Sequence, residues 1–264
     1  MYKRSISIIF SFVALLIGNT LFAQKRAVLD NYYNNEINKQ TGNPFHYLWS
    51  DTAMSGFSQL GDLFQAKGAV LSTLNSKPDK KKLKNADVFI LVDPDTKDET
   101  ANPNFMDATT AAAIAGWVKQ GGVLLLMTNN YKNAELDSIE LLTNYFGMQF
   151  TYDMLHPELS EKGKPRNFNS CASINLPSHP LFVGVNKIFL KEVAPIELKA
   201  PATAILTENG KTLMAEANYG KGYVFVIGDP WLYNEYIHHL MLPDDFENLK
   251  AAKNLVALLL EKCK

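Results

Sequence analysis

Cysteine is scarce in this sequence. Cys171 and Cys263 are the only two among 264 residues, and they stand far apart. They offer neither a disulfide framework nor a cluster of cysteine ligands for a metal. The GxSxG nucleophile elbow, the GxGxxG loop and the P-loop are also missing. Acyl-enzyme chemistry and nucleotide binding therefore have no support from motifs.

Neither sign of charge dominates, since 26 Lys and Arg stand against 27 Asp and Glu, and this balance disfavours a nucleic-acid partner. A hydrophobic run of the about 20 residues that a membrane helix needs is missing too. The apolar run from Ile6 to Ile17 follows Lys3 and Arg4, which is typical of a signal peptide. We expect a signal peptide at 1–23, a periplasmic or secreted protein, and no stable membrane insertion.

The middle of the chain alternates between buried strands and helices. Nearly uninterrupted apolar runs lie within 85–95 and 123–130, as in strands that are covered on both faces. Apolar spacing and composition predict helices over 51–68, 107–120 and 134–146, with Asp51 or Thr52 capping the first. The alternation predicts an open, mainly parallel α/β sheet.

The C-terminal part predicts an extension of this sheet. Short strands follow residue 186, and two of them are joined by Asn209 and Gly210, a strong signal for a β-hairpin. The apolar run 223–227 returns to the buried pattern, and a last helix is expected over 245–262. We expect a single α/β domain spanning 24–264.

Polar side chains follow three of the buried strands. Asp93 comes after the first, Asn129 and Asn130 after the second, and Asp229 after the run 223–227. Ligands of open α/β sheets bind in the crevice at the carboxyl ends of the strands. We therefore take Asp93, Asn129 and Asn130 as candidate substrate-binding residues.

The stretch "GDPWLYNEYIHH" supports two interpretations. As a helix capped by Asp229, it would put one aromatic side chain, one amide, one carboxylate and one imidazole on a single face, which suits a sugar ring. These four residues are Trp231, Asn234, Glu235 and His238. The alternative is a well-packed turn into a helix, which explains Asp229 and Pro230 but not why these four side chains share one face.

We expect no metal and no cofactor. Glu235 and His238 are three residues apart and could chelate an ion, but the adjacent His238 and His239 would point about 100° apart on a helix. A second cluster, in "GNPFHYLWSDT", puts His46 and Tyr47 in a loop before a helix, where a functional role is plausible. Trp49 in the same cluster is better explained by packing.

Five stretches of the chain resemble a secreted glutamine-amidotransferase-like α/β family that is associated with unsaturated glycuronyl hydrolases. They are "FHYLWSDTAMSGFSQLGDLF", "ADVFILVDPDTKDETANPNF", "WVKQGGVLLLMTNN", "HPLFVGVNKIFLKE" and "YGKGYVFVIGDPWLYNEY". The resemblance implies a sheet of the flavodoxin-like or class I amidotransferase-like type. The catalytic cysteine of true amidotransferases has no counterpart here, which argues against that activity.

The resemblance also implies a hydro-lyase of ulvan-type oligosaccharides. Such an enzyme eliminates water across C4 and C5 of a non-reducing-end uronic acid, and an unsaturated glycuronyl hydrolase then removes the product sugar. The reaction needs a cation for the carboxylate, a base for the C5 proton and an acid for the departing hydroxyl. The sequence offers Lys164 or Arg166 as the cation, His46 or His238 as the base, and Tyr47 or Tyr233 as the acid. The alternative is a non-catalytic carbohydrate-binding or scaffold module.

Overall fold

The computed structural model describes residues 24–159, 164, 166–237 and 242–264. The predicted signal peptide, 1–23, and the candidate base His238 lie outside the described residues. Within the described part, no helix has both the length and the apolar character needed to cross a bilayer.

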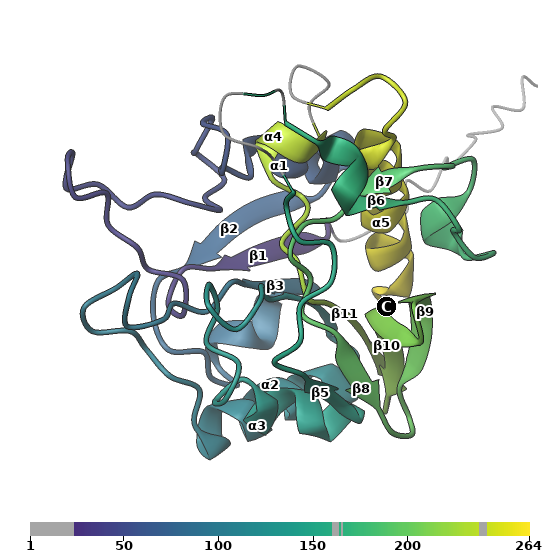
Figure 1. Cartoon of the computed structure of the whole chain (residues 1–264). Helices are drawn as coiled ribbons and strands as arrows, with labels where there is room; N and C mark the ends of the chain where they lie inside the picture. The colour runs from purple at the N-terminus through teal and green to yellow at the C-terminus, as the bar shows by residue number, and fades with distance from the viewer. Residues whose placement is uncertain (1–23, 160–163, 165, 238–241) are drawn as a thin grey trace, which may run out of the picture.

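A nine-stranded sheet forms the centre of the molecule (Figure 1). Its order is β2-β1-β3-β4-β11-β10-β8-β5, and β9 pairs with β10. The five strands from β2 to β11 are parallel, and β10, β9, β8 and β5 pair antiparallel. The strand bounds are β1 Arg26–Asp30, β2 Val70–Leu74, β3 Val88–Val92, β4 Val123–Met127, β5 Met148–Phe150, β8 Ile196–Leu198, β9 Thr203–Glu208, β10 Lys211–Tyr219 and β11 Gly222–Ile227. The predicted open, mainly parallel α/β sheet is confirmed.

The three apolar runs lie side by side as β3, β4 and β11. Each of these strands is buried on both faces. Val88, Ile90 and Val92 of β3 belong to one core cluster, while Phe89 and Leu91 belong to the other. Alternating side chains point to opposite faces of a sheet, so a strand between two cores must be apolar throughout.

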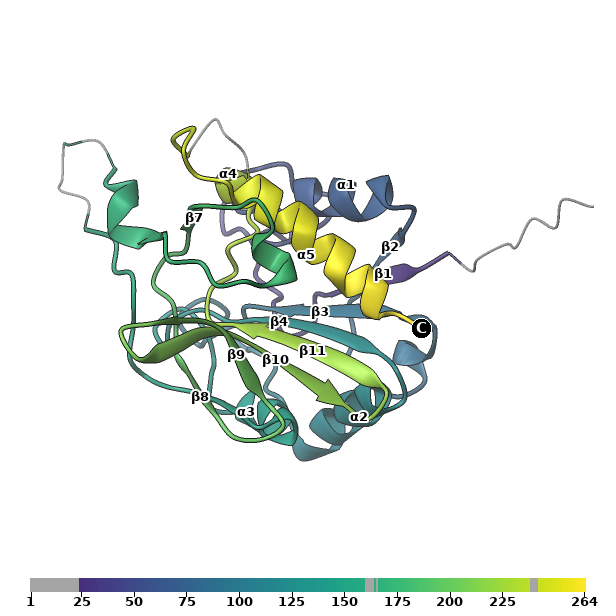
Figure 2. The ribbon, with the colours of Figure 1, turned by 90° about the vertical axis from the view of Figure 1, so that its right-hand side faces the viewer.

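Helices cover both faces of the sheet (Figure 2). The helices α1 and α5 pack on one face, and α2 and α3 pack on the other. The helix bounds are α1 Ser58–Ala66, α2 Ala108–Lys119, α3 Glu140–Thr143, α4 Asn234–Ile237 and α5 Asn248–Lys262. A small separate sheet pairs β6 Ala172–Ser173 with β7 Ile188–Phe189.

The helix predictions succeed where capping agrees with periodicity. Asp107 caps α2 by accepting a hydrogen bond from the Thr110 N–H. The first helix starts at Ser58, so the prediction that Asp51 or Thr52 caps it is wrong. Asp51 instead accepts a bond from Ala53 N–H at 2.8 Å, in a local turn. The helix predicted over 134–146 is reduced to α3 and a following 3₁₀ turn.

The predicted hairpin joins β9 to β10. Asn209 and Gly210 adopt φ angles of 50° and 74° between the two strands. A two-residue turn with both residues in this left-handed region matches the twist of an antiparallel pair. The predicted hairpin extension of the sheet is therefore confirmed.

Candidate functional site

A pocket of about 250 Å³ lies at the carboxyl edge of the parallel strands. Asp93 follows β3, Asn129 lies beyond β4, and Asp229 lies beyond β11, and all three line the pocket. This is the crevice where open α/β sheets bind ligands. The predicted convergence of the three strand ends is confirmed.

The backbone around this pocket is held in an unusual conformation. In the described part of the chain, six residues other than glycine have positive φ, and four of them line the pocket. They are His46 at 63°, Tyr47 at 53°, Asp93 at 42° and Glu192 at 53°. Each such residue costs on the order of 1–3 kcal/mol and persists only where the surrounding structure enforces it. Strain of this kind concentrates at functional sites.

A chain of short hydrogen bonds enters the pocket from the protein interior. The Tyr47 hydroxyl lies 2.5 Å from Asp93 Oδ2 and 2.6 Å from the Tyr233 hydroxyl. Asp93 Oδ1 is buried and has no hydrogen-bond partner among the described residues. The chain links a buried carboxyl group to a phenol in the pocket lining.

The groups of this chain favour their protonated forms. Burial, reinforced by the negative charge of Glu99, holds the pKa of Asp93 well above its usual range. Burial and the charge of Asp93 raise the pKa values of Tyr47 and Tyr233 well above that of a free phenol. Each of these shifts disfavours the charged form, so these groups hold their protons more firmly than a free carboxyl group or phenol does.

His46 enters the same pocket from the loop before α1. Its Nδ1 lies 2.6 Å from Oε2 of Glu36, which is almost fully buried. The carboxylate lies at ion-pair distance from the imidazole, although Glu36 Oε2 makes no hydrogen bond among the described residues. The Phe45 ring packs against the imidazole with a centroid separation of 3.8 Å. His46 thus has the arrangement of a general base.

Lys191 contributes an amine to the pocket lining. Its Nζ lies 3.0 Å from Glu158 Oε2 and 3.9 Å from Glu192 Oε2. Its backbone N–H donates to Asp229 Oδ2 at 2.7 Å. Burial raises the pKa of Asp229 to about 7.

A histidine behind the pocket fixes the segment that carries Lys191. His156 Nδ1 lies 3.0 Å from the Leu190 carbonyl, and Nε2 lies 2.8 Å from Glu208 Oε2. Burial opposes a charge on His156, but the hydrogen bond and charge of Glu208 outweigh it and raise the pKa of the imidazole. The Glu192 N–H closes this arrangement by donating to the His156 carbonyl at 2.9 Å.

Half of the residues chosen from the sequence meet in this pocket. They come from three regions of the chain: the loop before α1, the ends of β3 and β4, and the segment after β11. These residues are His46, Tyr47, Asp93, Asn129, Tyr233 and Glu235.

Three other candidates belong to the scaffold. Trp231 is fully buried in the core, so its predicted role as a stacking platform for a sugar is wrong. Asn234 is buried, and its Nδ2 donates to the carbonyls of Asp51 and Ala53 at 3.1 and 2.8 Å. Asn130 is buried and accepts a bond from the Lys132 N–H.

The shared helix face that suggested these roles does not exist. The helix α4 begins only at Asn234, so Trp231 precedes it and lies in the turn. Asp229 is not a cap, because its carboxylate accepts the Lys191 N–H instead. The prediction that the helix begins at residue 230, directly after Asp229, is therefore wrong.

The two candidate cations are also placed outside the pocket lining. Arg166 packs over the rings of Phe168, Phe189 and Tyr236 at 5.3 to 5.7 Å. Its Nη2 donates to the Tyr236 hydroxyl at 3.3 Å, so it supports a residue of the pocket lining from behind. Lys164 is exposed and does not line the pocket.

Three further residues line the pocket that the sequence analysis did not select: Lys191, Glu99 and Glu192. "KIFLKEVAPIELKA" looked like a strand, whereas Glu192 breaks it with a left-handed residue. The sequence does contain one indication of this break: Lys191 and Glu192 are two charged residues in an otherwise apolar stretch. Recognising it needed the position of this segment beside Asp229, which only the fold supplies.

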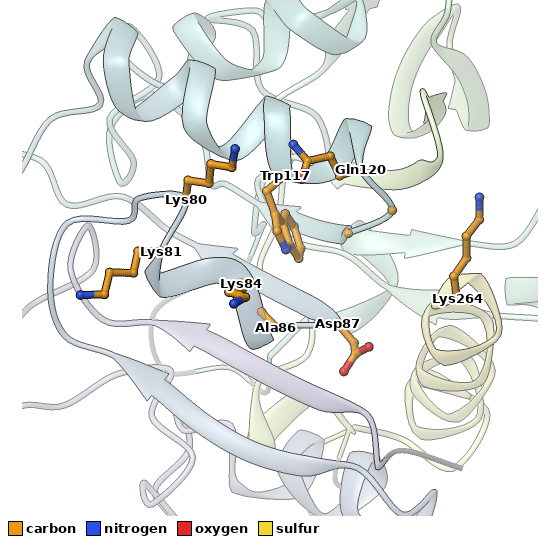
Figure 3. A pocket seen from close by; sticks show the side chains of 10 residues that line it. Lys80, Lys81, Lys84, Ala86, Asp87, Trp117, Gln120 and Lys264 are labelled. Atoms are coloured by element: carbon orange, nitrogen blue, oxygen red, sulfur yellow. The ribbon is translucent and has the colours of Figure 1, made fainter. Parts of the chain in front are cut away.

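A larger hollow of about 690 Å³ lies at the opposite edge of the sheet. Figure 3 shows the Trp117 ring between Lys80 and Lys264, with Asp87 below it. Asp87 already accepts a bond from the Arg26 N–H and pairs with a lysine. Its other charged groups are lysines at the surface, so we place the candidate site in the smaller pocket.

Metal binding has no visible basis in the described residues, where no group of three or more His, Cys, Asp and Glu side chains is placed to hold an ion. Cys171 and Cys263 are both free thiols.

No protein-family model and no curated protein sequence matches the chain. Its fold is similar to that of the N-terminal domain of mmIFT52, with a TM-score of 0.66 and 15% identity over 89% of this chain and 97% of that one. It is also similar to the cytoplasmic protein STM1381 from Salmonella typhimurium LT2, with a TM-score of 0.59 and 14% identity over 91% and 100% of the two chains. At such identities the likeness concerns the fold alone. Fold and pocket together define an α/β protein with a pocket at the carboxyl edge of its sheet.

Proposed function

We propose that this protein is an oligosaccharide dehydratase that acts on a non-reducing-end uronic acid. The observation that carries the proposal is the meeting of three groups in one pocket: the His46 imidazole beside the Glu36 carboxylate, the Tyr233 hydroxyl that is hydrogen-bonded to Tyr47, and the Lys191 amine. These are the base, the acid and the cation that such an elimination needs.

The elimination would begin at C5 of the uronic acid. His46 Nε2 accepts the C5 proton, and the electron pair of that C–H bond forms the C4–C5 double bond. Lys191 neutralises the substrate carboxylate, which lowers the cost of the charge that develops beside C5. This part of the reaction requires Lys191 to exchange Glu158 for the substrate carboxylate.

The C4–O bond breaks as the departing hydroxyl receives the Tyr233 proton and leaves as water. The Tyr47 hydroxyl donates to Asp93 Oδ2, so the oxygen of Tyr47 is left to accept the O–H of Tyr233. Tyr233 turns its O–H from Tyr47 to the departing hydroxyl and gives up that proton. His46 then returns its proton to solvent, and the Tyr233 phenolate takes one proton from solvent, which restores both groups.

The acidic character of the pocket is compatible with an anionic substrate. Asp93 and Asp229 favour protonation, and burial also raises the pKa of Glu99. A raised pKa reduces the negative charge on these carboxyl groups and therefore their repulsion of a uronate. We further propose that the protein works outside the cytoplasm, beside an unsaturated glycuronyl hydrolase.

The test is incubation with saturated oligosaccharides that end in a uronic acid. Dehydration is expected to produce ultraviolet absorbance from the conjugated enol ether and the loss of one water in mass. Tyr233→Phe is expected to lower the rate by about 10²- to 10⁴-fold, the usual contribution of a general acid. The matched control is Tyr131→Phe, an exposed tyrosine outside the pocket. Binding without turnover would instead favour a carbohydrate-binding module.

A further inference from the structure

A second hollow of about 420 Å³ adjoins the candidate site. His46 and Glu99 line both spaces, so the two are direct neighbours. The main pocket, at about 250 Å³, is below the about 300–1,000 Å³ of pockets that enclose a drug-sized ligand. It has room for one sugar unit, whereas the two hollows together have room for more.

The outer hollow is built largely by a small hairpin loop, residues 36–45 (Figure 1). Ile37 and Pro44 form an antiparallel bridge across it. The Asn38 side-chain oxygen accepts the N–H groups of Gln40 and Thr41 at 2.9 and 3.0 Å. The Glu36 carbonyl accepts the Phe45 N–H at 3.3 Å. The tip of the loop is therefore fixed by its own hydrogen bonds before any ligand arrives.

The lining of the hollow combines apolar and polar surface. Ile37 is 51% exposed, and Phe45 is half-buried beside His46. Gln40 and Lys39 are exposed at the loop tip, and no hydrogen bond of their side chains occurs among the described residues. Asp98 adds an exposed carboxylate on the opposite side. Apolar surface with a few separate donors and acceptors is how proteins hold the faces and hydroxyls of a sugar.

We propose that the hairpin loop 36–45 is a binding subsite for the second sugar of the substrate chain. This proposal rests on the proposed function, because the first sugar must occupy the main pocket. The uronic acid then directs its C1 towards the hairpin, and the next sugar lies between Phe45 and the loop tip. The amide of Gln40 and the amine of Lys39 donate to oxygen atoms of that second sugar.

The consequence is a preference for oligosaccharides over single sugars. Binding energy gained at a remote sugar contributes to kcat/KM of the reacting one. We expect kcat/KM to be at least about tenfold higher for a uronic-acid-ended disaccharide than for the methyl glycoside of the same uronic acid, equivalent to about 1.4 kcal/mol.

The experiment compares these two substrates in a matched pair of double variants. Lys39→Ala with Gln40→Ala removes the two donors at the loop tip, and Gln65→Ala with Lys67→Ala makes the same change on exposed residues at the end of α1. The hairpin variant is expected to lose most of the preference for the disaccharide and to keep wild-type kcat/KM on the methyl glycoside. The α1 variant is expected to behave as wild type on both.

Equal losses on both substrates, or no loss on either, would overturn the subsite. Calorimetric binding of the same two ligands separates this result from failure of the proposed function. If the wild-type protein binds both ligands without turnover, the dehydratase proposal fails. The subsite then stands if the hairpin variant loses affinity for the disaccharide alone, and it falls if the variant binds both ligands as wild type does.

Discussion

Two cations, Lys191 and Arg166, lie near the pocket in different environments. Lys191 lines the pocket and is exchangeable between two carboxylates. Arg166 is enclosed by three aromatic rings and bonded to the Tyr236 hydroxyl. A loop arginine was expected to bind substrate with little effect on stability. The packing of Arg166 instead assigns it to the support of Tyr236.

Removing the Lys191 amine is expected to weaken uronate binding. Lys191→Met should raise KM by about 10- to 100-fold, since a charge-assisted hydrogen bond contributes about 1.5–3 kcal/mol. Its thermal midpoint should change little. Steady-state kinetics on the uronic-acid-ended disaccharide measures the effect, and Lys221→Met, an exposed lysine outside the pocket, is the control. An unchanged KM for Lys191→Met would remove this amine from substrate binding.

Arg166→Met is expected to show the opposite pattern. Arg166 also pairs with Glu158, with Nε 3.2 Å from Oε1. The loss of this pair and of the ring contacts should lower the free energy of unfolding by about 1 to 3 kcal/mol. Urea unfolding measures this change. If the Arg166→Met protein were as stable as wild type but had a strongly raised KM, Arg166 would be a substrate-binding residue instead.

At the scale of elements, the segment from the end of β11 through the first residues of α4 is a structural clamp. The Asn234 N–H donates to the Gly56 carbonyl, and the Glu235 N–H donates to the Met54 carbonyl, both at 2.9 Å. The clamp ties the loop before α1 to the end of the sheet. It thereby brings Tyr47 and Tyr233 together from distant parts of the chain.

Trp231 belongs to this clamp and is fully buried in the core. Trp231→Ala is expected to lower the free energy of unfolding by about 3 to 5 kcal/mol, the usual cost of truncating a buried tryptophan. Trp231→Phe should cost less, because it leaves a smaller cavity. Thermal and urea unfolding of both variants provide the measurement. Normal stability of Trp231→Ala with weakened sugar binding would restore the stacking role.

The sequence predicted the elements better than the site. The buried strands β3, β4 and β11 were readable because burial on both faces leaves apolar runs without polar interruption. Asp93 and Asn129 followed from their position at strand ends. The predicted stacking role of Trp231 was wrong because the residues that favour the start of a helix also favour a turn. The place of Lys191 in the pocket could not be predicted from the sequence, since it depends on Glu158 and Asp229, which are distant along the chain. The contact of Glu36 with His46 likewise depends on the fold of the loop between them.

At the scale of the whole molecule, buried carboxyl groups link folding to pH. Burial raises the pKa values of Asp30 and Asp229 to about 7 from an ordinary value of 3.8. The folded protein therefore binds more protons than the unfolded chain between about pH 4 and 7. Stability from these groups is fully present below about pH 4 and is lost as the pH rises to about 7.

Asp30→Asn is expected to flatten this pH dependence. A shift of about three pKa units corresponds to on the order of 4 kcal/mol per group, so the wild-type free energy of unfolding should fall measurably from pH 4 to 7 and level off above. Urea unfolding at a series of pH values measures the curve. If the difference between wild type and Asp30→Asn does not vary across this range, Asp30 is ionised in the folded protein.

The place of β11 in the sheet also sets an order of assembly. This strand lies between β4 and β10, yet it is the last strand of the chain. Until residues 222–227 are synthesised, β4 has an open edge made of five consecutive apolar residues. Unpaired apolar edges invite pairing with other chains. The nascent protein thus passes through an aggregation-prone stage that ends only when β11 closes the gap.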